Sequence, residues 1–312
     1  MNRREFLETI SAAVVVPALS RQNPSANEWG APVFDLHFHL RPQPAGNLAH
    51  LDGAGVTKAN LLTRGAVLEQ VKALQAAAPG RFTWFNSYDV TKPDAEQVLT
   101  QAVKSGAQGF GEMKFHVAAD GPELRRLYAL AADLRVPLLI HFQEVDHFLN
   151  EGTWSTGFAR AFDSVLKAYP KTTFIGHADA FWANVSADYH DEAAYPTGPI
   201  KRGGLTDKWL SDHPNLFGDM SANSGNNAMS RDPEFTADFL KRHQDKLLFG
   251  SDCACTDGHG GGVSQNNNPA AARLAGKCVA RETLSVLKRS TSQDVFQKIV
   301  WGNAHTLLRI PA

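Results

Sequence analysis

The 312-residue sequence has little of several features that would place it in a specialised class of protein. It contains three cysteines, and an odd number without a repeated spacing does not indicate a disulfide framework or a structural zinc module. It also lacks an excess of charge of one sign, because 31 lysines and arginines balance 32 aspartates and glutamates. We therefore expect no nucleic-acid partner. Beyond the N-terminal segment, no stretch approaches the roughly 20 apolar residues of a membrane span.

The N-terminal segment, residues 1–26, has the pattern of an export signal. An Arg-Arg-Glu-Phe-Leu motif begins at Arg3, and a short apolar run covers residues 10–19. The motif resembles a twin-arginine signal, although its flanking residues depart from the usual ones. We therefore predict an exported, periplasmic protein. If the segment is instead an ordinary amphipathic helix, the predicted location is the cytoplasm.

The rest of the chain, residues 30–312, alternates short apolar runs with longer segments of helical periodicity, which is typical of parallel sheets built from strand–helix units. The eight predicted strands cover residues 33–40, 57–63, 82–88, 109–115, 136–142, 172–177, 216–221 and 246–251. The clearest predicted helices cover residues 66–78, 93–105, 122–134, 158–169, 233–243 and 292–301. This pattern favours one α/β domain, a (β/α)₈ TIM barrel. No Gly-x-Gly-x-x-Gly turn follows the first strand, which weakens the alternative of an open dinucleotide-binding sheet.

Two polar segments, residues 181–211 and 256–270, interrupt the alternation of strands and helices. Both follow strand ends, on the face where barrel enzymes build their sites, so they are candidate active-site loops or plain surface insertions. We expect Phe181 and Trp182 to pack beneath such a loop. We interpret the close pair of cysteines at 253 and 255 as small packing residues near a strand end.

Side chains with the chemistry of metal ligands stand where the predicted apolar strands end. They are His37 and His39 on the first strand, Glu112 on the fourth, His141 on the fifth, His177 on the sixth and Asp252 after the eighth. In a closed barrel the strand ends converge on one mouth, so these residues become neighbours. Imidazole and carboxylate together suit Zn²⁺, the metal that we expect, and also Mn²⁺ or another divalent ion.

This set of residues resembles the amidohydrolase superfamily, especially its amidohydrolase-2 branch, over nearly the whole chain after the N-terminal segment. The motifs that carry the resemblance are Asp35-Leu36-His37-Phe38-His39, Gly111-Glu112-Met113-Lys114-Phe115, Ile140-His141-Phe142, Gly176-His177-Ala178-Asp179, Gly250-Ser251-Asp252 and Gly302-Asn303-Ala304. Members are hydrolases or, in some cases, non-oxidative decarboxylases, usually with one or two divalent metals.

The resemblance implies a role for each matching residue. The ligands of a principal metal ion would be His37, His39, His141 and Asp252. Asp252 would also take a proton from the attacking water. His177 would bind a second metal, or would act as an acid that faces the substrate.

The fourth strand and two arginines offer further candidates. Superfamily members bridge two metals on this strand with either a glutamate or a carboxylated lysine, and the chain has both Glu112 and Lys114 there. The two can also form an internal ion pair. We expect Arg41, Arg64 and Lys114 to bind substrate, because arginine suits a carboxylate in bidentate contact. The alternative for the two arginines is a role in pinning loops.

We therefore predict a metal-dependent hydrolase that uses a metal-activated water to cleave an ester, lactone or amide-type C–O or C–N bond, with Asp252 as general base. The alternative enzyme is a metal-dependent, non-oxidative decarboxylase of an acidic aromatic substrate. A single metal faced by Arg41 or Arg64 would favour decarboxylation, whereas two metals bridged through the fourth strand would favour hydrolysis. A binding protein that has lost catalysis is a third reading, and the intact aspartate counts against it. The expected partner is a small-molecule substrate, and a homo-oligomer stays open.

Overall fold

The computed structural model describes residues 28–145, 147, 154, 156–190, 193–262 and 269–310. The predicted export signal, residues 1–26, lies outside these described residues. Within the described part of the chain, no helix combines the length and the apolar character that crossing a bilayer requires.

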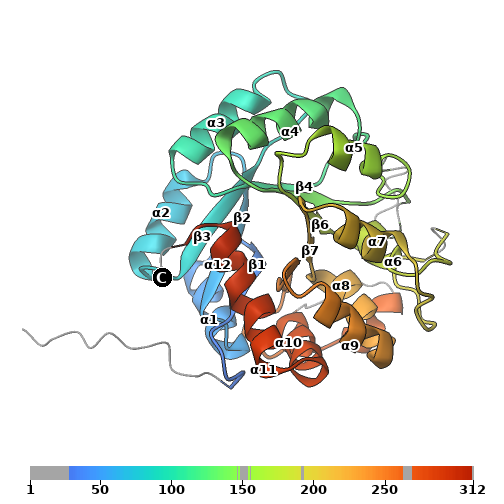
Figure 1. Ribbon diagram of the computed structural model, residues 1–312. Coiled ribbons are helices and arrows are strands. Elements are labelled where there is room, and N and C mark those ends of the chain that lie inside the picture. Colours follow the sequence, from blue (N-terminus) through green and yellow to red (C-terminus); the bar gives the residue numbers. More distant parts are fainter. Residues whose placement is uncertain are drawn as a thin grey trace, which may run out of the picture.

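Eight parallel strands form a single sheet in the order β1 to β8. Their bounds are β1 Phe34–His39, β2 Lys58–Arg64, β3 Phe82–Ser87, β4 Phe110–Met113, β5 Leu138–His141, β6 Phe174–His177, β7 Leu216–Asp219 and β8 Leu247–Leu248. The sheet closes where β1 meets the end of β8, because the Leu36 amide donates to the Phe249 carbonyl at 2.9 Å. Each strand overlaps a predicted one, and the predicted (β/α)₈ barrel is confirmed (Figure 1).

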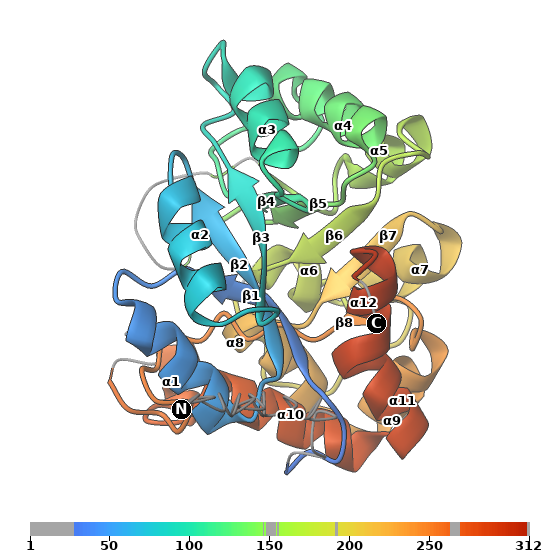
Figure 2. The same cartoon turned by 90° about the vertical axis from the view of Figure 1, so that its left-hand side faces the viewer.

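Helices surround the strands, as the two perpendicular views show (Figures 1 and 2). Their bounds are α1 Pro44–Ala54, α2 Leu68–Ala77, α3 Ala95–Lys104, α4 Pro122–Leu134, α5 Phe162–Ala168, α6 Asp179–Ala183, α7 Leu205–Asp212, α8 Ala222–Ser230, α9 Pro233–Arg242, α10 Val279–Ser290, α11 Gln293–Gln297 and α12 Asn303–Leu307. A short 3₁₀ helix covers Pro269–Leu274, and a π-helical turn, Lys298–Gly302, joins α11 to α12. All six predicted helices are present, with bounds that differ by a few residues.

The segment 181–211, expected to be an irregular loop or insertion, instead contains helical structure. It includes most of α6 and all of α7 except its last residue. Phe181 and Trp182 are fully buried, as expected from the sequence. The Trp182 indole N–H donates to the Asp219 carbonyl at 2.7 Å, so this segment packs directly against the end of β7.

The barrel interior has its own apolar cluster, separate from the layer between strands and helices. Its members on the strands are Phe34, Leu36, Leu62, Phe85, Leu139, Ile175 and Leu248. Ala304 and Leu308, on α12 and just after it, complete the cluster, so this helix covers the end of the barrel where the strands begin. The opposite end, where the strands finish, is left for polar side chains.

A buried ion cluster ties α7 to the end of α9. Asp207 accepts hydrogen bonds from Arg242 Nη2 at 3.0 Å and from His243 Nε2 at 2.6 Å. Burial raises the pKa of Asp207, but the hydrogen bonds from His243 and Arg242 outweigh it and lower the pKa from 3.8 to about 2. Folding therefore stabilises the ionised form of Asp207 relative to its protonated form.

We expect Asp207→Asn to lower the free energy of unfolding by about 2 kcal/mol at pH 7, the equivalent of the pKa shift. Because the folded pKa lies below the unfolded value, this stability is fully present above the unfolded pKa and is lost as pH falls through the folded one. The difference between wild type and variant should shrink to roughly half at pH 3. Urea unfolding at both pH values measures it, with the exposed Asp245→Asn as control. An equal difference at both pH values would contradict this assignment.

Candidate functional site

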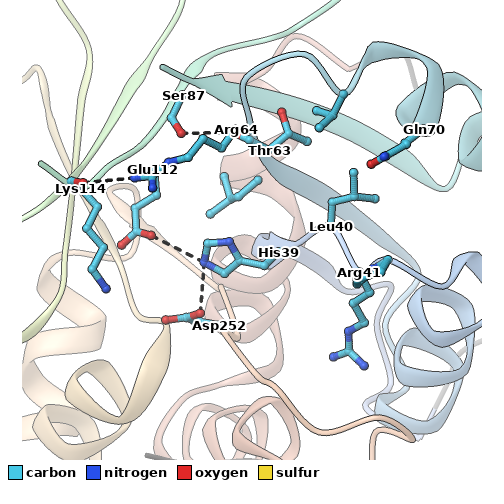
Figure 3. A pocket seen from close by; sticks show the side chains of 13 residues that line it. His39, Leu40, Arg41, Thr63, Arg64, Gln70, Ser87, Glu112, Lys114 and Asp252 are labelled. Carbon is cyan, nitrogen blue, oxygen red and sulfur yellow. Dashed lines mark hydrogen bonds and ion pairs between the residues drawn. The ribbon is translucent and has the colours of Figure 1, made fainter. Parts of the chain in front are cut away.

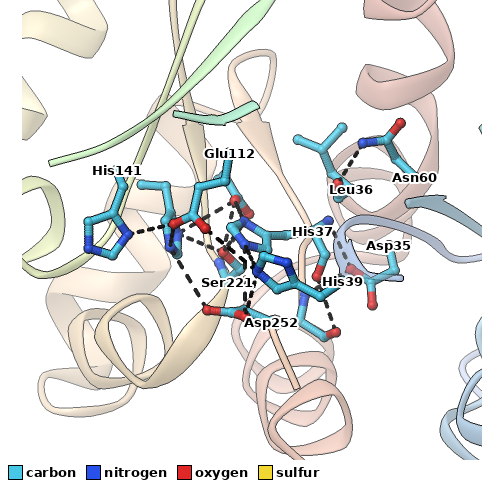
Figure 4. Close-up of polar contacts among 12 residues, drawn as sticks. Asp35, Leu36, His37, His39, Asn60, Glu112, His141, Ser221 and Asp252 are labelled. Carbon is cyan, nitrogen blue, oxygen red and sulfur yellow. Dashed lines mark hydrogen bonds and ion pairs between the residues drawn. The ribbon is translucent and has the colours of Figure 1, made fainter. Parts of the chain in front are cut away.

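Six side chains of the metal-ligand type meet at the mouth of the barrel (Figure 4). They are His37 and His39 of β1, Glu112 of β4, His141 of β5, His177 of β6 and Asp252 beyond β8. Their donor atoms form three overlapping groups of three, and within each group all donors lie within 4.8 Å of one another. The structure thus brings every residue of the sequence-derived ligand set to one place.

Glu112 stands between the two halves of this cluster. Its Oε1 lies 2.5 Å from Nδ1 of His141 and 3.4 Å from Nε2 of His177. Its Oε2 lies 3.6 Å from Nε2 of His39, which is itself 3.4 Å from Nε2 of His37. The carboxylate therefore presents one oxygen to His141 and His177 and the other to His39.

Asp252 enters the same space from the end of the barrel's last strand. Its Oδ1 lies 3.4 Å from Nε2 of His39 and 3.8 Å from Nε2 of His37. The backbone at Asp252 is left-handed, with φ 45°, a conformation that aspartate adopts more readily than most residues. Its amide donates to the His37 carbonyl at 2.8 Å, so a backbone bond to β1 holds the turn that aims the carboxylate.

Extra residues in two strands aim the ligands into the barrel. The pairing of β1 with β2 shifts register between Asp35 and Phe38. A β-bulge of this kind turns the following side chains to the other face of the strand. Leu36 can therefore join the interior apolar cluster while its neighbour His37 also reaches the mouth. The pairing of β4 with β5 shifts in the same way around Glu112.

Two residues that sequence reasoning missed, Asp219 and Ser221, hold the histidine rings. Asp219 Oδ2 lies 2.7 Å from Nδ1 of His37, and both side chains are fully buried. The Ser221 hydroxyl donates to Asp219 Oδ2 at 2.8 Å, and its oxygen lies 2.8 Å from Nδ1 of His177. Both rings are therefore engaged at Nδ1 and turn Nε2 toward the other donors, and hydrogen bonds of this kind orient histidines that bind metals. The available signal was an Asp-x-Ser pair at the end of the predicted strand, with both side chains on one face.

The first motif also contains a supporting residue. Asp35 is fully buried, and its Oδ1 accepts the amides of His37 at 3.0 Å and of Ser251 at 2.8 Å. It thereby fixes β1 against the end of β8. Burial is the main cause that raises the pKa of Asp35 to about 6.

The electrostatics of the mouth are those of a cation site. Burial lowers the pKa of His37, but Asp252 and Asp219 outweigh it and raise the pKa to about 10. Burial raises the pKa of Glu112, but the imidazoles of His141 and His37 outweigh it and lower the pKa well below the usual value. The Glu112 carboxylate thus stays ionised and attracts positive charge into the cluster.

The donor set fits a divalent metal ion. Imidazole nitrogen and carboxylate oxygen are the ligands that Zn²⁺, Mn²⁺ and related ions take in proteins. Lys114, the alternative to Glu112, directly follows β4, and its Nζ lies 5.6 Å from the centre of the Trp154 ring.

A cavity of about 590 Å³ opens in front of the metal cluster (Figure 3). The donors that reach it are His39, Glu112 and Asp252, and the cations that line it are Arg41, Arg64 and Lys114. All three cations predicted to bind substrate therefore face the space where a substrate would sit.

The two arginines differ in how firmly they are held. The Arg41 guanidinium donates to the Cys253 carbonyl at 2.9 Å and lies 4.9 Å from the centre of the Phe38 ring, so it ties the loop after β8 to β1. Arg64 is exposed, although its guanidinium donates to the Lys114 carbonyl at 3.3 Å and lies 5.1 Å from the centre of the Phe115 ring. Arg64 is therefore the freer of the two to meet a ligand.

The amidohydrolase family profile matches residues 37–310. This match begins at the first histidine of the cluster and ends beyond α12, so it spans the barrel and every donor described above. A search of curated protein sequences finds no match to the chain.

Three solved structures share the fold. The dihydroorotase from Campylobacter jejuni is 19% identical, with a TM-score of 0.52 over 90% of this chain and 84% of that one. The 5-carboxyvanillate decarboxylase LigW from Sphingomonas paucimobilis is 12% identical, with a TM-score of 0.55 over 90% and 99%. A TatD homologue from Escherichia coli K12 is 16% identical, with a TM-score of 0.52 over 89% and 98%. At these identities the likeness is one of fold.

We expect Asp219→Asn to weaken the binding of a divalent metal by about 10- to 100-fold, because the His37 ring loses the carboxylate that orients it. Competition with a chromophoric chelator measures the affinity, and circular dichroism checks the fold. Asp212→Asn, an exposed residue of α7, is the matched control and should bind metal as the wild type does. Unchanged affinity in a folded Asp219→Asn protein would rule out this orienting role.

Proposed function

Because the chain belongs to the amidohydrolase family, we propose that it is a metal-dependent hydrolase that cleaves an ester, lactone or amide-type bond of a small molecule. The observation that carries the proposal is the position of Glu112, with Oε1 toward His141 and His177 and Oε2 toward His39. A carboxylate shared in this way suits a pair of ions, and paired ions clamp both the attacking and the leaving oxygen in hydrolysis.

The residues that would hold the metal are the six donors of the cluster, with Zn²⁺ as the first candidate. A divalent ion bound there supplies a Lewis acid that polarises the substrate carbonyl and makes water more acidic. Asp219 and Ser221 keep the two deepest rings, His37 and His177, in the required orientation.

Asp252 is the proposed general base. Burial raises its pKa, but His37 and His39 outweigh burial and lower it, so the carboxylate is ionised and able to accept a proton at neutral pH. About a third of its side chain, 30%, is exposed at the cavity, which gives it access to water and substrate. Asp252 would take a proton from the water that attacks the substrate carbonyl and would then pass it to the leaving group, whose departure completes bond cleavage.

His177 has a different character. Burial and the charge of His37 lower its pKa well below 6.5, so the ring is neutral. Its side chain is only 1% exposed, and its Nε2 faces Glu112 and Asp252. These properties favour a role as metal ligand over that of an acid that meets the substrate directly.

The cavity wall indicates the substrate class. Arg64 and Lys114 line it on the side of β2 and β4, and Arg64 is exposed. A guanidinium in this place suits a carboxylate of the substrate. We therefore infer that the enzyme prefers an acidic small molecule.

The same cationic wall favours the second candidate, a non-oxidative decarboxylase of an acidic aromatic substrate. A carboxylate held by Arg64 and Lys114 beside the metal donors would be placed for loss of CO₂. The fold admits this chemistry, since a decarboxylase is among the structures that share it. Hydrolysis ranks first because the two oxygens of Glu112 face different donors, a position that would suit a pair of ions.

A substrate panel separates the two candidates. We expect the metal-loaded enzyme to turn over lactones, esters or amides that carry a carboxylate, in preference to neutral analogues, and to place ¹⁸O from labelled water in the product. Aromatic acids tested in parallel should release no CO₂. Release of CO₂ without uptake of ¹⁸O would reverse the order of the two proposals.

Replacement of the proposed base tests the mechanism. We expect Asp252→Asn to lower kcat by roughly 10²- to 10⁴-fold, the usual contribution of a positioned base. Metal content, measured by mass spectrometry, shows whether the amide still ligates. Asp245→Asn, on the outer surface, serves as the control with unchanged kcat. Wild-type turnover in Asp252→Asn protein with its metal retained would show that another group takes the proton.

A further inference from the structure

The three cysteines of the chain meet one histidine in a second cluster that the proposed reaction does not use. Cys253 and Cys255 follow β8, Cys278 directly precedes α10, and His50 lies on α1. Their exposed fractions are 7%, 0%, 3% and 0%, so the cluster is buried throughout. One potential ligand atom from each residue lies within 4.8 Å of the others.

The sulfur separations match a tetrahedral metal centre. Sγ of Cys253 lies 3.3 Å from Sγ of Cys255 and 3.8 Å from Sγ of Cys278. Zn–S bonds of about 2.3 Å at the tetrahedral angle place sulfurs about 3.8 Å apart. A disulfide needs about 2.05 Å, and all three cysteines are free thiols. The separation from Cys278 equals the tetrahedral value and the one from Cys255 is somewhat shorter, so the sulfurs need only a small shift to surround a common ion.

The imidazole of His50 is placed to supply the fourth donor. Its Nδ1 faces the thiols, 3.4 Å from Sγ of Cys255 and 2.9 Å from the Cys255 carbonyl oxygen. Its Nε2 is buried and has no hydrogen-bond partner among the described residues. A neutral imidazole binds metal ions through either ring nitrogen, so the ring brings a donor that zinc takes to the edge of the thiol cluster.

The charge around the cluster suits a loaded site. Three thiolates and a neutral imidazole around Zn²⁺ carry a net charge of about −1. Arg41 is partly buried beside the cluster, and its guanidinium donates to the Cys253 carbonyl at 2.9 Å. A fixed cation next to a buried anionic centre lowers the cost of burying that centre.

We propose that His50, Cys253, Cys255 and Cys278 bind a structural Zn²⁺ that is separate from the metal centre at the barrel mouth. Thiolate and imidazole are ligands that zinc prefers, and a Cys₃His set fills all four positions. No position is left for water or substrate, so the ion holds the fold instead of reacting. The proposal does not depend on the hydrolase activity.

The ion would join α1, the loop after β8 and the start of α10. The loop after β8 already packs tightly on α1, since a Cβ at Gly53 would lie 1.8 Å from the Asp257 carbonyl oxygen. Arg281 of α10 donates to the Gly53 carbonyl at 2.7 Å, which brings the third element to the same place. Asp252 directly precedes the first cysteine, so zinc at this cluster would anchor the left-handed turn that aims its carboxylate.

The first test uses the wild-type protein and reads the ligands directly. X-ray absorption at the zinc edge should show sulfur neighbours at about 2.3 Å. Titration with an organomercurial should release one zinc for every three thiols, because the mercury takes the sulfurs and the donors at the barrel mouth contain none. Zinc with only nitrogen and oxygen neighbours, or thiols that react without releasing zinc, would overturn the proposal.

The second test separates the two centres. Cys278→Ser should lose the zinc of the cysteine cluster, one per chain, together with the sulfur signal. His39→Asn, which alters the barrel mouth, should keep the zinc of the cysteine cluster and its sulfur signal. If Cys278→Ser does not fold, the wild-type titration decides. A disulfide among the cysteines of freshly purified wild-type protein, found by counting thiols after denaturation, would also overturn the proposal.

Discussion

The hydrogen bond between Nδ1 of His37 and Asp219 Oδ2, 2.7 Å long and fully buried, is the contact on which the mouth of the barrel depends. It joins the first strand to the seventh across the barrel mouth, and it turns Nε2 of His37 toward the other donors. A buried, unpaired carboxylate would be costly, so Asp219 needs both this ring and the hydroxyl of Ser221. The polar cluster is therefore stable only in the closed barrel, where strands distant in sequence supply each other's partners.

The backbone carries a second constraint. Strand residues alternate between two faces, so a regular strand that buries Leu36 inside the barrel would turn its neighbour His37 outward. The bulge in β1 removes that conflict, and the one in β4 does the same around Glu112. Just after β6, β7 and β8, the residues Ala178, Ala222 and Asp252 take positive φ. The chain therefore turns sharply at the mouth of the barrel, where the candidate ligands point inward. Irregular geometry is thus concentrated where the chemistry is proposed to occur.

Much of this arrangement could be predicted from the sequence, because it depends on local pattern. Alternating apolar runs gave all eight strands, and the convergence of strand ends in a barrel predicted which polar residues would meet. Helices α1 and α8 were not predicted, because glycine and asparagine interrupt any apolar stripe in them. Asp219 was missed because an aspartate at a strand end is equally common in turns. The cysteine cluster could not be foreseen, since His50 precedes the first cysteine, Cys253, by 203 residues.

The adjacency of Asp252 and Cys253 shows how one loop can serve two kinds of metal chemistry. The left-handed turn at Asp252 sends the two neighbouring side chains to different places. The Asp252 carboxylate lines the cavity with His39, while Cys253 is buried beside the other two cysteines. Oxygen and nitrogen donors at the open mouth leave room for a substrate, whereas sulfur donors close a buried site completely. Separate donor sets on neighbouring residues would keep the proposed structural ion close to the proposed reactive one without mixing their ligands, and the structural ion would stiffen the peptide that carries Asp252.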